Sequence, residues 1–452
     1  MLRVAVIGSG PSGVYTAQSL IEQETVPDIE IYVLDRLPCP YGLVRYGVAP
    51  DHEKIKSLQN NLRTVLEHPR VHFVGNVEAG APGLGVEELR EIFDAVVFCV
   101  GAATDRHLGI PGEDLPGSHP ATDFVAWYSA HPDAAATRFA LTARSAVVIG
   151  VGNVAVDVTR MLSRAAAELA ATDMPHGPLG ALADSRVEDV WMVGRRGPSQ
   201  AKFTTKELRE LGSLPGTEVL VRPEELALDP AYRDPAGLPA VARRNVEVLR
   251  GWAEQPAGGA PVGRRRRIHL RFFLRPVEIL GDAGGVRAVR FERTAPDGSG
   301  GVAGTGRFEE IEGQLVLRSV GYRGTPQPGL PFDEATGTVP HSAGRVLREG
   351  VPLPGVYVAG WIKRGPTGVI GTNRPCAKET ARSLLADAAA SAGRATAGDP
   401  VAALARAGQR PVLWPGWLAI EAAEAAWGQG LGRGTVKLPD WEGLLEAARA
   451  AT

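Results

Sequence analysis

Cysteine is scarce in this sequence, and its few residues stand far apart. Cys39, Cys99 and Cys376 are the only three, and no two of them form a C-x-x-C pair. This absence excludes the dithiol chemistry of disulfide reductases, and it excludes zinc or iron–sulfur ligation at the usual spacing. Cys99 lies in an apolar run, which predicts a buried and unreactive thiol. So few cysteines are compatible with the reducing cytoplasm, where we expect this protein to be found.

Long apolar runs and an excess of one charge are also missing. No stretch of 18 apolar residues occurs, so we expect no transmembrane helix. The formal net charge of −2 leaves the whole molecule without a nucleic-acid-binding footprint. An apolar segment begins so close to residue 1 that we expect no signal or transit peptide. The 452 residues, 44% of them hydrophobic, instead predict a globular protein of two or three domains, and we expect it to be a monomer.

What the sequence does contain is a glycine-rich turn between an apolar strand, residues 4–7, and a helix. The turn has the G-x-G-x-x-G spacing and is formed by Gly8, Gly10 and Gly13. Glycine is required where such a turn tightens, where backbone meets a pyrophosphate and where helix packs on strand. The helix N-terminus also attracts the pyrophosphate. Asp35 ends the next strand, 22 residues after Gly13 (35 − 13), where a carboxylate can bind ribose hydroxyls.

The same pattern occurs a second time, with a different residue type at the end of its second strand. The strand at residues 146–149 enters a turn with Gly150, Gly152 and, in the third place, Ala155. The next strand ends at Arg195 and Arg196 instead of an acid. An acid would repel a 2′-phosphate, whereas guanidinium groups bind it bidentately, so we expect NADP rather than NAD. A solvated basic turn is the alternative.

Two further apolar strands that end in glycine, at residues 95–101 and 355–360, flank the second unit. We therefore predict an α/β fold with two Rossmann-like dinucleotide-binding domains, the NADP domain being inserted into the FAD domain. The expected bounds are 1–102 with 326–452 for the FAD domain and 103–325 for the NADP domain. FAD is the expected cofactor of the first because a flavin accepts two electrons from NADPH and releases them singly.

Several longer segments resemble the adrenodoxin reductase family, including bacterial ferredoxin–NADP reductases of this type. They are LPCPYGLVRYGVAPDH at 37–52, GNVAVDV at 152–158, GRRGPSQAKFTTKELRE at 194–210, RSVGYRG at 318–324 and YVAGWIKRGPTGVIGTN at 357–373. These blocks are specific and stand in family order. The resemblance implies hydride transfer from NADPH to FAD, followed by single-electron transfer to a ferredoxin-like iron–sulfur protein. The lack of an expected presequence favours the bacterial form over the mitochondrial one.

The resemblance also assigns cofactor-binding roles to matching positions. The implied FAD contacts are Gly8, Gly10, Ser12, Gly13, Asp35, Leu43, Val77, Trp361, Gly368, Val369 and Ile370. The implied NADP contacts are Arg106, Val151, Gly152, Asn153, Val154, Arg195, Arg196, Glu207 and Gly368. Residues 368–370 are also expected to begin a helix whose dipole stabilises negative charge on a reduced flavin. For Glu207 the alternative is an acid of a first helical turn that binds no ligand.

Three polar residues are implied to lie near the nicotinamide or on a proton path. They are His52, Asp157 and Glu210. Hydride transfer itself requires positioning and no side-chain acid. A structural hydrogen bond for His52 and a satisfied buried acid for Asp157 therefore remain alternatives.

Basic pairs along the chain are candidates for docking an acidic ferredoxin. Lys363 and Arg364, next to the expected flavin contacts, are the first choice, followed by Arg243 and Arg244 and by residues 264–267. Electrostatic steering between opposite charges speeds association and weakens with salt. A solvated surface without a partner is the alternative for each pair.

Three other functions remain open at this stage. Another flavin enzyme, resembling a glutamate synthase small subunit or a thioredoxin reductase, is disfavoured because its cysteine clusters are missing here. A non-enzymatic flavoprotein could bind NADP as a sensor or scaffold, and rapid bleaching of the flavin by NADPH would argue against it. An NADPH oxidase or diaphorase acting on quinones or dyes is the third, although reduced flavins show such activity in vitro anyway.

Overall fold

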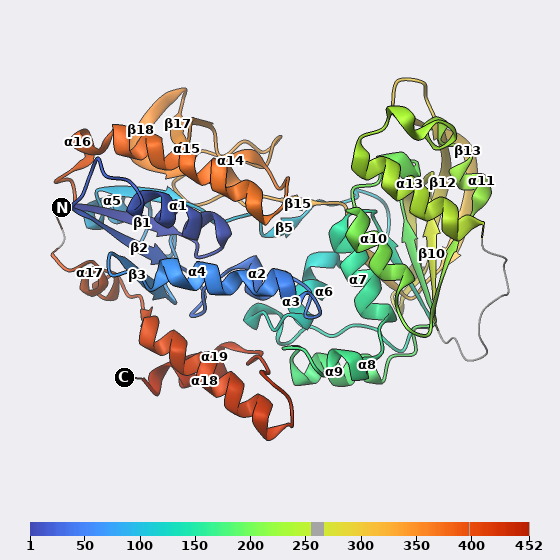
Figure 1. The fold of residues 1–452 in the computed structure, drawn as a ribbon, viewed down its shortest axis with the longest axis horizontal. Helices are drawn as coiled ribbons and strands as arrows, with labels where there is room; N and C mark the ends of the chain where they lie inside the picture. Colours follow the sequence, from blue (N-terminus) through green and yellow to red (C-terminus); the bar gives the residue numbers. More distant parts are fainter. Residues whose placement is uncertain (255–265, 397, 452) are drawn as a thin grey trace. The chain divides into compact units, whose positions relative to one another are not determined.

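The computed structural model describes residues 1–254, 266–396 and 398–451, which form two compact units (Figure 1). Unit 1 comprises Met1–Thr104 and Gly321–Thr452, and unit 2 comprises Asp105–Val320. Unit 2 is therefore inserted into the chain of unit 1. Within the described part of the chain, no helix is both long enough and apolar enough to cross a bilayer. Of the expected docking residues, 264 and 265 lie outside the described residues.

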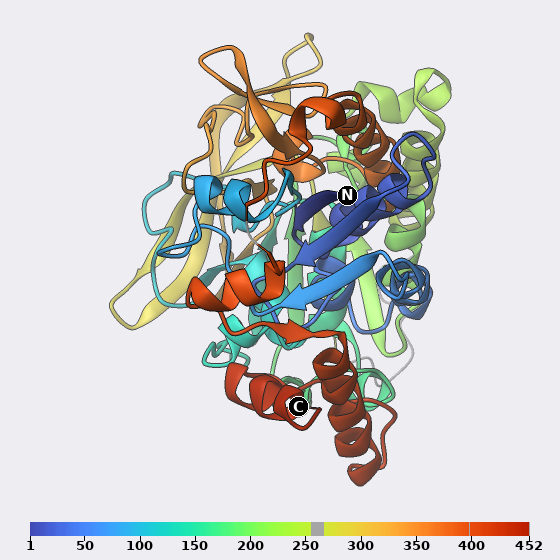
Figure 2. The same cartoon turned by 90° about the vertical axis from the view of Figure 1, so that its left-hand side faces the viewer.

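Unit 1 is built on an eight-stranded sheet with the order β16-β17-β18-β4-β1-β2-β3-β19. Its five central strands are mutually parallel. They are β18 (Val351–Val358), β4 (Ala95–Phe98), β1 (Leu2–Ile7), β2 (Ile29–Leu34) and β3 (Val71–Gly75). The edge strands β16 (His341–Ser342), β17 (Arg345–Arg348) and β19 (Val412–Leu413) run antiparallel to their neighbours. Figure 2 shows the short red strand β19 below the blue strands of this sheet.

The apolar run of β1 reflects a strand that is buried on both faces. Val4 and Val6 pack in one hydrophobic core, whereas Ala5 and Ile7 pack in a second core on the opposite side of the sheet. Successive side chains of a strand point to opposite faces, so only a sheet covered on both sides requires an unbroken apolar run. The sequence pattern thus encodes a central parallel strand.

Helices cover both faces of this sheet. They are α1 (Pro11–Ile21), α2 (Leu43–Tyr46), α3 (Glu53–Lys56), α4 (Leu58–Leu66), α5 (Val86–Ile92), α14 (Trp361–Arg364), α15 (Asn373–Ala386), α16 (Ala388–Ser391), α17 (Pro400–Arg406), α18 (Trp414–Gly430) and α19 (Trp441–Arg449). α1 packs against α15, so helices from the two ends of the chain lie side by side (Figure 1).

Unit 2 contains a parallel sheet of its own, with the order β6-β14-β7-β8-β10-β9. Its strands are β6 (Ser118–Pro120), β14 (Leu315–Arg318), β7 (Ser145–Ile149), β8 (Asp189–Val193), β10 (Arg266–Arg271) and β9 (Thr217–Val221). Its helices are α6 (Ala121–Tyr128), α7 (Asn153–Ser163), α8 (Ala166–Leu169), α9 (His176–Ala183), α10 (Thr205–Gly212), α11 (Pro223–Leu226), α12 (Pro230–Arg233) and α13 (Ala240–Ala253). The α/β fold with two parallel sheets expected from the sequence is confirmed.

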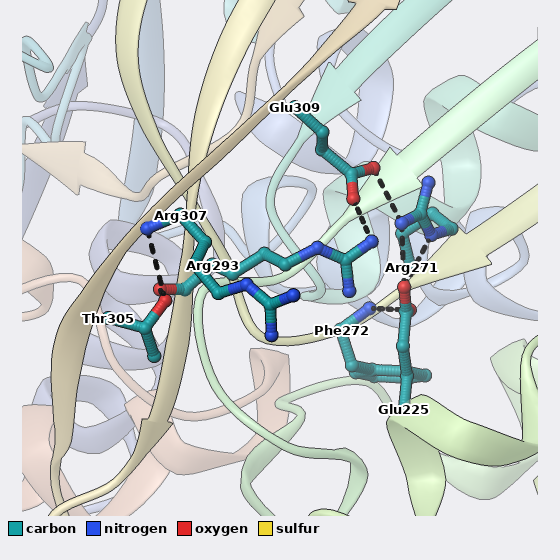
Figure 3. Close-up of polar contacts among 7 residues, drawn as sticks. All are labelled: Glu225, Arg271, Phe272, Arg293, Thr305, Arg307 and Glu309. Carbon is teal, nitrogen blue, oxygen red and sulfur yellow. Dashed lines mark hydrogen bonds and ion pairs between the residues drawn. The ribbon is translucent and has the colours of Figure 1, made fainter.

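An antiparallel sheet of three strands completes unit 2: β11 (Leu274–Asp282), β12 (Gly285–Pro296) and β13 (Val302–Glu312). A charged network attaches it to the parallel sheet (Figure 3). Arg271 of β10 donates to Glu225 of α11 at 2.8 Å and to Glu309 of β13 at 2.7 Å. Glu309 also accepts from Arg293 of β12. Since Arg271 and Glu225 are buried, both charges need this pairing.

Candidate functional site

The glycine turn of unit 1 lies where the sequence places it, between β1 and α1. Gly8 has a φ of 107°, and a Cβ there would lie 2.6 Å from the carbonyl oxygen of Cys99. A Cβ on Gly13 would lie 1.8 Å from the carbonyl oxygen of Gly8. Both positions therefore require glycine, one for conformation and packing and the other for the close approach of helix and strand.

The N-terminus of α1 is open to an anion. Gly10 is its N-cap, and no side chain among the described residues caps it. The N–H groups of a first helical turn have no partner within their own helix, so they are available to a phosphate. Gly42 approaches this turn, since a Cβ on it would lie 2.9 Å from the Cα of Gly10. A second glycine-dependent segment therefore lines the candidate phosphate site.

Asp35 follows β2 and lies beside the same turn. Its carboxylate accepts a hydrogen bond from the Ser9 amide at 2.8 Å, another from the Ser9 hydroxyl, and one from the Leu37 amide at 2.9 Å. Burial raises the pKa of the Asp35 carboxyl above its ordinary value, and the donated hydrogen bonds oppose that shift. The Asp35 carboxylate therefore has a structural role, because it attaches the glycine turn to the end of β2.

A small hollow of about 240 Å³ opens beside the ends of β2 and β3. Carboxyl ends of parallel strands are where ligands bind in folds of this class. Val77, an expected FAD contact, is 1% exposed and belongs to a hydrophobic core of unit 1. Leu43, another expected FAD contact, is 40% exposed at the start of α2. The hollow is lined by Arg36, Asn76, Glu78, Gly408, Gln409, Arg410 and Trp441.

The segment that follows β18, at residues 359–361, lies next to the first glycine turn. Gly360 has a φ of 78°, and a Cβ on it would lie 2.4 Å from the hydroxyl oxygen of Ser12. Trp361 then begins α14, and its buried indole nitrogen has no hydrogen-bond partner among the described residues. A buried donor of this kind is available to a ligand that can accept a hydrogen bond from it. Ser12, an expected FAD contact, therefore lies next to Gly360, the residue before Trp361.

Residues 368–370 lead into a short 3₁₀ turn that precedes α15. Gly368 has a φ of 81°, Val369 is 63% exposed, and residues Ile370–Thr372 form a single 3₁₀ turn. The α-helix, α15, begins only at Asn373. The helix expected to begin at residues 368–370 therefore starts at Ile370 as a 3₁₀ turn, in which the Thr372 hydroxyl accepts from the Val369 amide at 3.1 Å, and it becomes α-helical at Asn373.

Lys363 does not belong to a docking surface, and this expectation is corrected. Its side chain is 3% exposed and forms an ion pair with Glu379. Its ammonium also donates to the Thr380 hydroxyl at 3.1 Å. Arg364 is half-buried and donates to the Asn373 side chain at 3.0 Å. Lys363 is turned inward because α15 supplies polar partners for it, which local sequence does not reveal.

The second glycine turn, in unit 2, joins β7 to α7. Gly150 has a φ of 140°, and a Cβ on it would lie 2.1 Å from the carbonyl oxygen of Ser319. By contrast, no described atom lies within 4 Å of a Cβ built on Gly152, so that side of the turn is open to a ligand. Asn153, the first residue of α7, accepts from the Thr204 amide at 2.8 Å and thereby positions the start of α10.

The arginines expected at the 2′-phosphate stand at the carboxyl end of β8. Arg195 is exposed and Arg196 is half-buried. Their carbonyl groups accept from Thr294 and Phe273, which fixes the backbone against the three-stranded sheet. Neither guanidinium forms an ion pair with any of the described residues, and the same holds for the exposed Arg106. These three cations are therefore available to an external anion.

A residue that the sequence analysis did not single out organises the remaining acids of unit 2. Arg160 of α7 is buried, and its guanidinium lies 2.8 Å from Asp157, 3.6 Å from Glu207 and 3.3 Å from Glu210. Glu207 is also an acid of the first turn of α10. The only sequence signal for this cluster was the i, i+3 spacing of Asp157 and Arg160. His52, the third expected polar residue, is buried at the N-terminus of α3 in unit 1.

Two glycine turns, each on a parallel sheet, define a class: the oxidoreductases that bind two dinucleotides. A sequence model of the pyridine nucleotide-disulphide oxidoreductase family matches residues 2–193. The structure is similar to that of Mycobacterium tuberculosis FprA in complex with NADPH, with a TM-score of 0.91, 43% sequence identity and 99% coverage of both chains.

Curated relatives match along almost the whole chain. The NADPH-ferredoxin reductase FprA of Mycobacterium tuberculosis is 45% identical over 464 residues, covering 98% of each chain. The mitochondrial NADPH:adrenodoxin oxidoreductase of Mus musculus is 40% identical and covers 98% of this chain and 91% of its own. The chain therefore belongs to the NADPH-ferredoxin and adrenodoxin reductase family, and it is an oxidoreductase.

Proposed function

We propose that this protein is a ferredoxin–NADP reductase, which takes electrons from NADPH and passes them singly to a ferredoxin-like iron–sulfur protein. The observation that carries the proposal is the pair of glycine turns with opposite charges beside them. Asp35 stands next to the first, and Arg195 and Arg196 stand after the strand that follows the second. The names of the relatives, NADPH-ferredoxin reductase and NADPH:adrenodoxin oxidoreductase, support the same reaction.

The residues of unit 1 fit FAD as the resident cofactor. When bound, FAD supplies the chemistry of accepting two electrons together and giving them up one at a time. The open N-terminus of α1 would hold the pyrophosphate, and Asp35 would hold the ribose. The indole nitrogen of Trp361, which has no partner among the described residues, offers a hydrogen-bond donor, and the exposed Val369 offers apolar surface. We accordingly assign the FAD domain to the chain segments 1–102 and 326–452.

The residues of unit 2 fit NADPH as the electron donor. Arg195 and Arg196 would bind the 2′-phosphate, with Arg106 as a further cation, because guanidinium groups match phosphate geometry. The free space at Gly152 admits the pyrophosphate to the start of α7. We assign the NADP domain to residues 103–325.

Arg160 would hold in place the acids expected near the nicotinamide. Its guanidinium holds Asp157, Glu207 and Glu210 together, so these carboxylates are fixed in place and partly neutralised. A positioned carboxylate in this cluster can bind a carboxamide or retain a proton without moving. The cluster would therefore position the nicotinamide, while NADPH and the cofactor carry out the hydride transfer.

The proposed electron acceptor and cellular compartment are supported by charge and by cysteine content. An acidic ferredoxin is the proposed acceptor, and the exposed Arg243 and Arg244 of α13 remain candidates for its docking. Three cysteines in 452 residues support a reducing cytoplasm, and a monomer stays our prediction.

The test is NADPH-driven reduction of cytochrome c through an added, purified ferredoxin, with a ferredoxin-free control. A rate that depends on the ferredoxin and falls with ionic strength is expected. Good reduction of a dye but no dependence on any ferredoxin would refute the proposed acceptor. Release of the flavin by heat, followed by chromatography against FAD and FMN, identifies the cofactor independently of activity.

A further inference from the structure

One face of α15 carries three exposed cations in a row. Arg374, Lys378 and Arg382 are spaced four residues apart, so they lie on the same side of the helix. With a rise of about 1.5 Å per residue, the row extends over roughly 12 Å. We call these three residues the α15 basic face.

The charge of this face is not balanced within unit 1. Among the described residues none forms an ion pair with these three side chains, although Arg374 lies over the Tyr15 ring at 4.9 Å. The nearest acid on the same helix, Glu379, is taken by the ammonium of Lys363. Like charges four residues apart repel and weaken a helix. The fold therefore maintains an unfavourable row of like charges, and a partner of opposite charge would relieve it.

The basic face begins beside the segment 368–372, which holds expected flavin contacts and which we call the flavin-side turn. The expected flavin contacts at residues 368–370 lead through the 3₁₀ turn Ile370–Thr372 directly into α15. Arg364, which follows Trp361 on α14, donates to Asn373 at the first position of α15. Since electron tunnelling falls steeply with distance, a protein acceptor must dock close to the flavin. The basic face offers such a position on unit 1 itself.

We propose that the α15 basic face is a docking surface for the acidic side of the ferredoxin. The inference rests on the proposed function and adds the surface through which unit 1 receives the partner. The face replaces the buried Lys363, and Arg364, which is half-buried and donates to Asn373, as the basic element next to residues 368–372.

The experiment compares two double charge reversals in the holoenzyme. Lys378→Glu with Arg382→Glu changes the basic face but leaves Arg374, beside the turn, in place. Arg287→Glu with Arg307→Glu changes exposed residues of unit 2 by the same total charge and serves as the control. For each protein, the KM for a purified acidic [2Fe–2S] ferredoxin is measured at low and high salt. NADPH-dependent reduction of ferricyanide and the flavin content show that the remaining machinery is intact.

The basic-face variant is expected to raise the KM for ferredoxin by roughly tenfold at low salt, with a weaker salt dependence than the wild type. Ferricyanide reduction should stay within twofold, and the control variant should keep a KM close to that of the wild type. A basic-face variant with the wild-type KM, while the wild type reduces ferredoxin, overturns the surface alone. A wild-type protein that reduces no acidic ferredoxin overturns the proposed function and this surface with it.

Discussion

Arg45 and Glu424, 379 residues apart in the chain, form an ion pair at 2.5 Å in the interior of unit 1. Their side chains are 5% and 2% exposed. Arg45 belongs to α2, directly after Gly42, which approaches the first glycine turn. Glu424 belongs to α18 and also accepts from the Leu438 amide at 2.9 Å. Helix α18 therefore holds in place the segment that lines the proposed pyrophosphate site.

Removing one partner of this pair is expected to be costly. Glu424→Ala should lower the free energy of unfolding of unit 1 by about 3–5 kcal/mol, because it leaves the Arg45 charge buried and unpaired. The double variant Arg45→Met, Glu424→Leu should recover much of that loss. Urea unfolding followed by circular dichroism measures both. Glu278→Ala, which removes an exposed partner of Arg290, should cost at most about 1 kcal/mol and serves as control.

Gly13→Ala is expected to impair flavin binding. The new methyl group would meet the carbonyl oxygen of Gly8 at 1.8 Å, and relief of that clash displaces α1 from β1 at the pyrophosphate site. The purified variant should show a lower ratio of flavin to protein absorbance than the wild type. Gly430→Ala, with no described atom within 4 Å of its new methyl group, is the matched control. Full flavin content in Gly13→Ala would contradict the assigned role.

Replacing Arg195 and Arg196 together with alanine should weaken the binding of NADPH far more than that of NADH. Each charge-assisted hydrogen bond to a phosphate is worth about 1.5–3 kcal/mol, so the KM for NADPH should rise by roughly tenfold or more. The KM for NADH should change little, since NADH has no 2′-phosphate. Both KM values are measured by steady-state reduction of a dye with NADPH or NADH as the donor. An unchanged ratio of the two KM values would refute the assignment of the 2′-phosphate site.

The three cysteines should differ in reactivity. Burial raises the pKa of the Cys39 thiol to about 11 and that of Cys99 to about 12. At pH 8 their reactive thiolate forms are therefore on the order of a thousandth of the total or less. Iodoacetamide should alkylate the partly exposed Cys376 first, as peptide mass spectrometry would show. Equal labelling of all three is expected only after denaturation, and rapid native labelling of Cys39 would contradict this burial.

Local sequence predicted the parts of the site whose geometry is local. The glycine turns could be located because conformation and close packing at Gly8, Gly13 and Gly150 exclude other residues. The strand ends at Asp35 and Arg195 follow from the apolar runs before them. These features depend on a few consecutive residues, so their pattern is visible in the chain.

Contacts between distant segments were not predictable. Lys363 looked like a surface cation, but Glu379 and Thr380 of α15 draw it inward. Arg160 binds acids from another helix, 47 and 50 positions later in the sequence (207 − 160 and 210 − 160). Such pairings depend on how helices pack, and a single sequence carries no periodic signal for them. For the same reason, the buried charge pairs were missed while the apolar cores were not.

The pairing of β18 with β4 has a consequence for how the chain is made. β4 ends at Phe98, but its parallel partner β18 begins only at Val351. During synthesis, one edge of β4 therefore waits unpaired while all of unit 2 leaves the ribosome. Exposed strand edges invite pairing with other chains, and pairings distant in sequence form slowly. Unit 2, whose sheet is contained in one continuous segment, can fold during that wait, so rapid maturation of the insertion shortens the interval in which the nascent protein is prone to aggregate.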